Sequence, residues 1–323
     1  MIVILLLAVV QLGWAVPSKQ LHPLSAEYID EINSKQSLWK AEKYFDDYEL
    51  FRTIATGAKK YDGKKILVVH NATEDVPESF DSAENWSECA DIISLIRDQS
   101  RCGACWAFAA VEAMSDRICI HSNGTRKLLV SSQDLLTCAA VGGCNGGWPY
   151  LAWYAWKFGI VTGGLYNTTE QGCKSYFLEP CNDHPNKCTN YVKTPACVDS
   201  CDISSQSYKQ SETYGKTPYE VVGEKQIQLE ILKNGPVEAT MDVYEDFASY
   251  KSGIYKQITG KYEGGHAVKI VGWGVENDVK YWKIANSWNE NWGENGYFRI
   301  LRGVDEVGIE SDITGALPNF SKF

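Results

Sequence analysis

The chain has 323 residues, with 31 Lys or Arg against 41 Asp or Glu, so its formal net charge is −10. This acidity argues against nucleic acid and anionic membrane surfaces as partners. The length suits two domains or one large one, with ample material for a hydrophobic core. All 11 cysteines lie between residues 89 and 201, which indicates an exported, disulfide-bonded protein whose odd cysteine count leaves one thiol over.

Residues 1–15 are predicted to be a secretory signal. The apolar run Ile2–Val10 is too short to span a bilayer, and Gly13 and Ala15 offer small residues at a plausible cleavage point. We therefore expect an exported protein that has no membrane association once the signal is removed.

Residues 16–75 differ in composition from the rest of the chain. They contain no cysteine and hold amphipathic segments at Ala26–Ile32 and Leu38–Ile54, whereas the chain from Asp81 onward is rich in Trp, Gly and Cys. This shift predicts a prosegment at 16–75 followed by a mature enzyme at 76–323. The alternative is a small independent domain, which would have few apolar residues to bury.

The most informative motif lies in the stretch Asp98–Phe108. A loop containing Gly103 leads into an Ala-rich segment without Gly or Pro, Cys105–Ile118, which is predicted to be a helix. Cys105 then lies in the first turn, where free N–H groups and the helix dipole lower the pKa of a thiol. Cys105 is therefore the candidate nucleophile. Read as a C-x-x-C tetrad alone, Cys102 and Cys105 would suit a redox pair or half of a zinc site as well.

Further along, the predicted elements change from helices to strands. Helices are expected after a capping signal at Ser131–Asp134, at Tyr150–Phe158 and at Lys225–Lys233. Strands are expected at Val237–Val243, His266–Trp273, Tyr281–Ala285 and Tyr297–Leu301. The chain is thus predicted to be α+β, with a helical lobe mainly at 76–200, a β-rich lobe mainly at 201–323, and a cleft where the lobes meet.

A thiolate protease needs a proton donor for the leaving amine, and histidine suits this task near neutral pH. His266 follows Gly265 at the head of a predicted strand, where glycine lets a peptide backbone approach. A single His at a strand start is more often structural. Asn286 supports a functional reading, because it can accept a hydrogen bond from the imidazole and fix its tautomer, with Trp288 shielding that bond. Together with Cys105 this is the Cys-His-Asn form of the catalytic triad.

The sequence C-G-A-C-W at Cys102–Trp106 also fits the signature around the nucleophile of papain-like proteases. Other motifs point the same way: Asp98-Gln99, Ala113–His121, Gly143–Gly147, Gly163–Tyr166, Asn234–Glu238, Gly272–Asn277, Asn286–Trp288 and Gly308–Ser311. Over nearly its whole length the chain resembles the cathepsin B branch of the papain family of cysteine proteases.

The resemblance implies a papain-like two-lobed fold, with a helical left lobe and a β-barrel-like right lobe, and peptide-bond hydrolysis through an acyl-enzyme. It implies that Cys105 is the nucleophile, His266 the acid/base and Asn286 its orienter, while Gln99 and the Cys105 N–H form the oxyanion hole. The residues implied to bind substrate are Gly146, Gly147 and Gly265 for the backbone and Trp288 on the primed side. The implied disulfides are Cys89–Cys119, Cys102–Cys144, Cys138–Cys197, Cys173–Cys201 and Cys181–Cys188.

The same resemblance implies protein and peptide substrates and an inhibitory prosegment as partners, a monomer, no cofactor or metal, and a lysosomal or secreted location. The loop between Cys181 and Cys188 is short and contains the single His184. The family has two adjacent histidines there, one of which grips the substrate's C-terminal carboxylate. We therefore expect endopeptidase activity and leave dipeptidyl carboxypeptidase activity open. Asp312 matches the acidic residue at the base of the second specificity pocket, the alternative being a surface Asp.

Two weaker patterns are also present. The stretch Tyr281–Glu294 resembles a pattern of haemoglobin-degrading cathepsin B-like proteases of blood-feeding worms, which points to a nematode digestive type. Glycosylation sequons occur at five asparagines: Asn71, Asn85, Asn123, Asn167 and Asn319.

Two rival functions remain at this point. A catalytically inactive secreted binding protein of the same fold requires a broken triad, but the candidate triad residues and Gln99 are all present. A thioredoxin-like oxidoreductase requires Cys102 to be free. One free thiol in the mature protein would favour the protease and three would favour the redox pair.

Overall fold

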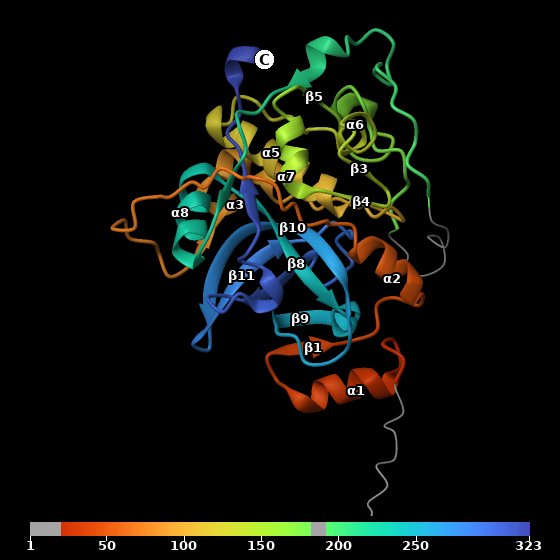
Figure 1. Cartoon of the computed structure of the whole chain (residues 1–323), viewed down its shortest axis with the longest axis vertical. Helices are drawn as coiled ribbons and strands as arrows, with labels where there is room; N and C mark the ends of the chain where they lie inside the picture. Colours follow the sequence, from red (N-terminus) through yellow and green to blue (C-terminus); the bar gives the residue numbers. More distant parts are fainter. Residues whose placement is uncertain (1–20, 182–191) are drawn as a thin grey trace, which may run out of the picture.

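The computed structural model describes residues 21–181 and 192–323 and has two lobes, one mainly helical and one built on a curled sheet (Figure 1). The helices are α1 (Ala26–Lys35), α2 (Tyr48–Ala55), α3 (Ser82–Asn85), α4 (Ala90–Ile93), α5 (Cys105–His121), α6 (Ser132–Cys138), α7 (Pro149–Ala155) and α8 (Glu224–Asn234). The earlier strands are β1 (Trp39–Ala41), β2 (Phe80–Asp81), β3 (Gly142–Gly143), β4 (Gly146–Gly147), β5 (Ile160–Val161), β6 (Glu212–Thr213) and β7 (Tyr219–Val221). The later strands are β8 (Val237–Tyr244), β9 (Tyr250–Tyr255), β10 (Tyr262–Glu276), β11 (Val279–Ala285), β12 (Tyr297–Leu301) and β13 (Ile313–Gly315).

Helix α5 is the centre of the helical lobe, and the predicted helix over Cys105–Ile118 is confirmed with three more residues at its end. All its residues up to Ile120 are buried, so even its charged side chains need partners inside the protein. Lys269 of β10 supplies one, because its ammonium lies 2.9 Å from a carboxylate oxygen of Asp116. This buried pair joins α5 to the sheet lobe.

The sheet lobe follows the strand order β1-β9-β12-β11-β10-β8-β13-β7, and β2 also pairs with β10. The four predicted strands are confirmed as β8, β10, β11 and β12, which lie side by side. Within the described residues this path is open, so the sheet is barrel-like without closing. Its inner face encloses Trp282, Ile284, Phe298 and Ile300, which are all fully buried. The two lobes also share segments of chain, since β2 pairs with β10 of the sheet and Ala316 packs in the helical core. The C-terminus lies at the helical lobe (Figure 1).

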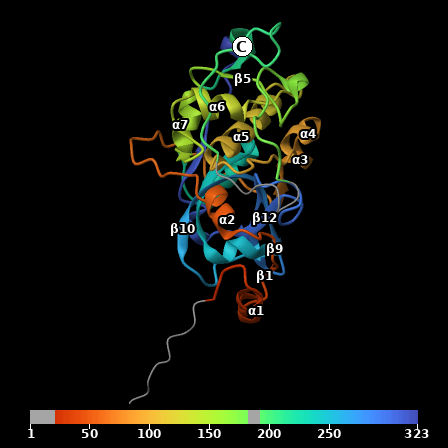
Figure 2. The same ribbon diagram turned by 90° about the vertical axis from the view of Figure 1, so that its right-hand side faces the viewer.

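The segment comprising residues 21–75, here called the N-terminal segment, contacts both β9 and β7, which lie at opposite ends of the sheet contributed by the rest of the chain. At one edge β1 pairs antiparallel with β9, and the Trp39 indole donates to the Lys256 carbonyl at 2.9 Å. At the other edge the Val68 N–H donates to the Glu220 carbonyl of β7 at 3.0 Å. Between these two attachments α2 lies at the junction of the lobes (Figure 2). The segment is therefore bound along the whole enzyme rather than at one point.

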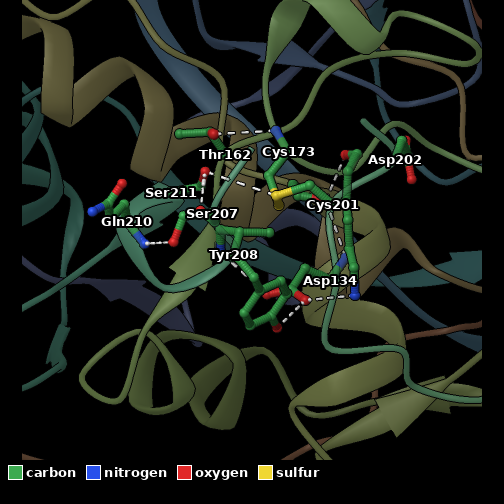
Figure 3. Close-up of a disulfide and its surroundings, with 12 residues drawn as sticks. Asp134, Thr162, Cys173, Cys201, Asp202, Ser207, Tyr208, Gln210 and Ser211 are labelled. Carbon is green, nitrogen blue, oxygen red and sulfur yellow. Dashed lines mark hydrogen bonds and ion pairs between the residues drawn. A yellow bond between two sulfur atoms is a disulfide. The ribbon is translucent and has the colours of Figure 1, made fainter. Parts of the chain in front are cut away.

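Four disulfides are formed among the described residues: Cys89–Cys119, Cys102–Cys144, Cys138–Cys197 and Cys173–Cys201. Around Cys173–Cys201 the loops are also held by polar contacts, including the Tyr208 hydroxyl, which donates to Asp134 at 2.6 Å (Figure 3). For the expected pair Cys181–Cys188, the second cysteine, Cys188, lies outside the described residues. No helix of the described part has the length and apolar character needed to cross a bilayer.

A buried ion pair fixes α5 to α8. Arg117 donates to Glu230 at 2.9 Å, and both side chains are fully buried. Burial alone would raise the pKa of Glu230, but Arg117 and the hydrogen bond from His70 lower it to about 2. A folded-state pKa below the unfolded value stabilises the fold at neutral pH, and this contribution is lost as pH falls from about 4.5 towards 2.

Arg117→Ala should therefore lower the free energy of unfolding by about 3–5 kcal/mol, because it removes the guanidinium paired with the buried Glu230 carboxylate. Arg126→Ala serves as the control, since Arg126 is an exposed arginine of the same lobe and its loss should cost under about 1 kcal/mol. Urea unfolding measures both. Equal losses in the two variants would contradict the role given to the buried pair.

Candidate active site

The Cys105 thiol lies at the first residue of α5, and its side chain is fully buried. Cys105 is the free cysteine among the described residues, whereas Cys102 is bonded to Cys144. This disulfide contradicts the redox pair and the zinc half-site, which both require Cys102 as a thiol or thiolate. One nucleophilic sulfur is left at a helix N-terminus.

His266 and Asn286 meet because β10 and β11 are paired strands. The His266 Nε2 lies 2.8 Å from the Asn286 Oδ1. The same oxygen accepts from the Ser287 N–H at 2.9 Å, which identifies it as the amide oxygen and makes Nε2 the protonated ring nitrogen. The Nδ1 atom of His266 has no hydrogen-bond partner within the described part of the chain. The Trp288 ring lies 4.9 Å from the imidazole and shields the hydrogen bond to Asn286.

The Gln99 amide is held in one orientation by contacts at both ends. Its oxygen accepts from the Ser287 hydroxyl at 2.7 Å, and its Nε2 donates to the Cys102 carbonyl at 2.8 Å. The remaining donor of Nε2 reaches the Ile54 carbonyl of the N-terminal segment at 3.0 Å. The donor that was predicted to bind an oxyanion therefore binds a carbonyl oxygen of the chain itself.

A peptide backbone already lies in the cleft beside Cys105. The Gly147 N–H donates to the Gly57 carbonyl at 2.9 Å, and the Lys59 N–H donates to the Gly147 carbonyl at 2.8 Å. On the opposite wall the Ala58 N–H donates to the Gly265 carbonyl at 2.9 Å. A Cβ on Gly146 would lie only 2.6 Å from the Gly57 oxygen, so these walls admit a backbone because they lack side chains.

The covering backbone changes the ionisation of both reactive groups. Burial raises the pKa of Cys105 to about 12, although N–H groups of Ala267, Gly57 and Trp106 act in the opposite direction. Burial likewise lowers the pKa of His266 to about 4, against the hydrogen bond to Asn286. The expectation that the helix N-terminus lowers the thiol pKa is thus wrong for the intact chain. The physical reason is that the thiolate would lose its water, and this loss outweighs the stabilisation by the surrounding N–H groups.

Asp312 faces a cavity of about 270 Å³ next to Gly265. The enzyme side of this cavity includes Thr240, Met241 and Ser311. In the intact chain Asp312 is only 8% exposed, with the N-terminal segment in place. Its carboxylate lies 2.5 Å from the ammonium of Lys65, a residue of the N-terminal segment.

The other predicted residues fall outside this cluster. His184 lies outside the described residues. Of the five sequon asparagines, Asn319 is half-buried and the other four are exposed: Asn71, Asn85, Asn123 and Asn167.

Trp288 is buried and contacts Phe45 and Phe51 of the N-terminal segment, with ring centroids 5.7 and 6.0 Å away. Two residues of the site were not predicted from the sequence. They are Ser287, which orients both Gln99 and Asn286, and Glu220, which shares Lys65 with Asp312. Ser287 could have been found from its place between Asn286 and Trp288, but no motif marks Glu220.

Comparisons with known proteins agree with this geometry. The family described as papain family cysteine protease matches residues 76–317. A cathepsin B-like cysteine proteinase 6 of Caenorhabditis elegans is 44% identical over 91% of this chain and 83% of its own. A cathepsin B-like cysteine proteinase of Schistosoma japonicum is 46% identical over 93% of this chain and 92% of its own. The solved procathepsin B S9 of Trypanosoma congolense superimposes with a TM-score of 0.82 at 32% identity, over 93% of this chain and all of that one.

A helical lobe and a sheet lobe that enclose a buried thiol, an imidazole and an amide define a cysteine protease of the papain type. The chain belongs to the papain family of cysteine proteases. Within that family it is cathepsin B-like, and its structural counterpart is a proenzyme.

Gly57 offers a test of the covering contact. A Cβ at this position would lie 2.3 Å from the Gly103 carbonyl oxygen and 3.0 Å from the Cys105 sulfur, so Gly57→Ala must lift the N-terminal segment. We expect iodoacetamide to alkylate Cys105 in the intact variant at least about tenfold faster at pH 7, because water returns to the thiol. Ser37→Ala is the control, since Ser37 is an exposed residue of the same segment. An unchanged alkylation rate in Gly57→Ala would contradict the role of this contact.

Proposed function

We propose that the chain is the zymogen of a cysteine endopeptidase in which Cys105 is the nucleophile. The observation that carries this proposal is the backbone of residues 57–59, which is hydrogen-bonded between Gly147 and Gly265 directly over Cys105. A groove that binds main-chain groups on both walls suits any peptide, whatever its side chains. A thiol at the middle of such a groove, with His266 and Asn286 beside it, suits hydrolysis of a peptide bond.

The residues have distinct roles in the proposed reaction. With the segment gone, the Cys105 thiolate attacks the carbonyl carbon of the scissile bond, and the oxyanion accepts hydrogen bonds from the Gln99 amide and the Cys105 N–H. His266 then donates a proton to the leaving amine, which departs and leaves a thioester. Water, deprotonated by His266, hydrolyses the thioester and restores the thiol group. Asn286 holds the imidazole with Nδ1 free for this exchange.

The N-terminal segment is the inhibitor in this proposal, and the boundary of the mature enzyme lies near residue 76. The Ile54 carbonyl occupies a Gln99 donor, and residues 57–59 occupy the hydrogen-bonding groups of both walls. Phe45 and Phe51 cover Trp288, which we assign to the primed side of the cleft. These contacts leave no room for a substrate until the segment is removed.

We assign proteins and peptides as the substrates. The enzyme acts as a monomer, either in a lysosome or outside the cell. The acidic chain and the cathepsin B-like relatives support this setting. An inactive binding protein of this fold is the second candidate, but Cys105, His266, Asn286 and Gln99 are all present, and His266 is hydrogen-bonded to Asn286, which speaks against it. The proposal is confined to endopeptidase action.

The decisive experiment compares the processed enzyme with its Cys105→Ala variant. The wild-type protein, matured by acid or by an added protease, should hydrolyse fluorogenic peptides, and an epoxide inhibitor should label only Cys105. The variant should retain its fold and disulfides, because Ala fits the same buried space, and should lose activity by at least about a thousandfold. Turnover by the variant above trace level, or labelling elsewhere, would refute the assignment.

Asp312 is proposed to bind a basic side chain two residues before the scissile bond, in a pocket that otherwise accepts apolar side chains. Asp312→Ala should lower kcat/KM for Arg at that position by about tenfold, because a partly solvated ion pair contributes about 1 kcal/mol or slightly more. Substrates with Phe or Val there should be nearly unchanged. Equal losses on Arg and Phe substrates would mean that Asp312 is structural.

A further inference from the structure

Lys65 of the N-terminal segment contacts two carboxylates at once. Its ammonium lies 2.5 Å from Asp312 and 3.1 Å from Glu220. The side chains of Lys65 and Asp312 are each 10% exposed and that of Glu220 is 22% exposed, so all three are largely shielded from water. Burial alone would lower the pKa of Lys65, but the hydrogen bonds and charges of Asp312 and Glu220 raise it. The pair of carboxylates is therefore a cation site in the intact chain.

The sheet explains why these two carboxylates are neighbours. Glu220 of β7 is paired with Thr314 of β13, and Asp312 precedes Thr314 by two residues. Because side chains alternate along a strand, Glu220, Thr314 and Asp312 lie on the same face of the sheet. The Thr240 N–H, on the far side of β13, donates to the Asp312 carbonyl at 3.1 Å and fixes the backbone there. The site is thus built by the enzyme's own strands, not by the segment that occupies it.

An aromatic ring borders the same site. The Lys65 ammonium lies 5.8 Å from the centre of the Tyr150 ring, within the range of a cation–π contact. The same ring is covered by Tyr61, whose ring is stacked on it at 5.2 Å with planes inclined by 5°. Loss of the N-terminal segment would uncover this ring together with the two carboxylates. The uncovered surface would then present two negative charges and a π face with no cation between them.

We propose that Glu220 is a second specificity residue of the cleft, which binds together with Asp312 the cation of a single Lys or Arg side chain of the substrate, against the Tyr150 ring. This inference rests on the proposed function, and in particular on the pocket assigned to Asp312. Lys65 marks the place that the substrate cation takes. The side chain that enters is the one two residues before the scissile bond.

Two carboxylates discriminate more strongly than one. In the empty site the like charges repel each other, and a cation placed between them relieves that repulsion and gains both attractions. A neutral side chain of the same shape leaves both carboxylates without a partner in a half-buried place. Arginine has the further advantage that its planar fork can donate to two carboxylates and stack on a ring. The pocket should therefore prefer Arg to Lys, and either to a neutral residue.

The test uses the matured enzyme and two peptide substrates that differ only at the second residue before the scissile bond. One carries Arg and the other citrulline, which has nearly the same shape without the charge. Glu220→Gln should lower the ratio of kcat/KM for Arg over citrulline by about fivefold, with the citrulline value unchanged. Glu170→Gln is the control, because it removes one negative charge from an exposed residue outside the cleft and should leave the ratio as it is.

Asp312→Asn and the double variant separate the possible outcomes. If both carboxylates hold one cation, each single variant lowers the ratio and the two losses are not additive. If Asp312→Asn lowers the ratio and Glu220→Gln does not, Glu220 serves only to hold Lys65, and this inference is overturned while the proposed function stands. If the wild-type enzyme hydrolyses neither peptide and no other peptide, the proposed function itself fails, and this inference fails with it.

Discussion

Exclusion of water from Cys105 is the constraint on which the intact protein depends. A backbone seated between Gly147 and Gly265 buries the thiol and the imidazole together. Burial then acts on the two groups in opposite directions, raising the pKa of Cys105 and lowering that of His266, so that both are uncharged near neutral pH. The N-terminal segment therefore does more than block access to the cleft. The segment also withholds the ionised pair that the proposed reaction needs.

The same burial couples latency to acidity. The pKa of His266 is about 4 while it is covered, against an ordinary value of 6.5, and each unit of difference corresponds to about 1.4 kcal/mol. A group whose pKa is lower in the covered state binds its proton only after uncovering. The covered state is thus fully favoured above pH 6.5, and it loses stability as pH falls from there towards 4. We therefore expect acid to loosen the N-terminal segment through protonation of His266.

The sequence predicted what depends on local pattern and missed what depends on distant contacts. The helix that begins at Cys105 was correct because the segment is Ala-rich and lacks Gly and Pro. The long strands of the second lobe were correct because they are rich in β-branched and aromatic residues and are punctuated by Gly. The amphipathic stretch Leu38–Ile54 contains a strand, β1, and a helix, α2, because β1 exists only through its pairing with β9. The predicted ionisation of Cys105 was wrong because it, too, depends on a contact with a distant part of the chain. The helix N-terminus can be read from the sequence and the resemblance implied an inhibitory prosegment, but the contacts that this segment makes over the thiol cannot be read from it.

The path of the N-terminal segment also explains why the segment is not cleaved while it lies in the cleft. The group that faces the Cys105 sulfur is the Gly57 N–H, which is a hydrogen-bond donor and offers no carbon to attack. The carbonyl that reaches the Gln99 amide belongs to Ile54, three residues earlier. The proposed nucleophile and the proposed oxyanion donor thus meet two different peptide groups. Ala58 pairs in the parallel sense with Gly147 on one wall and in the antiparallel sense with Gly265 on the other, so the segment fills the hydrogen-bonding groups of both walls. No single peptide bond of the segment contacts both the proposed nucleophile and the Gln99 amide.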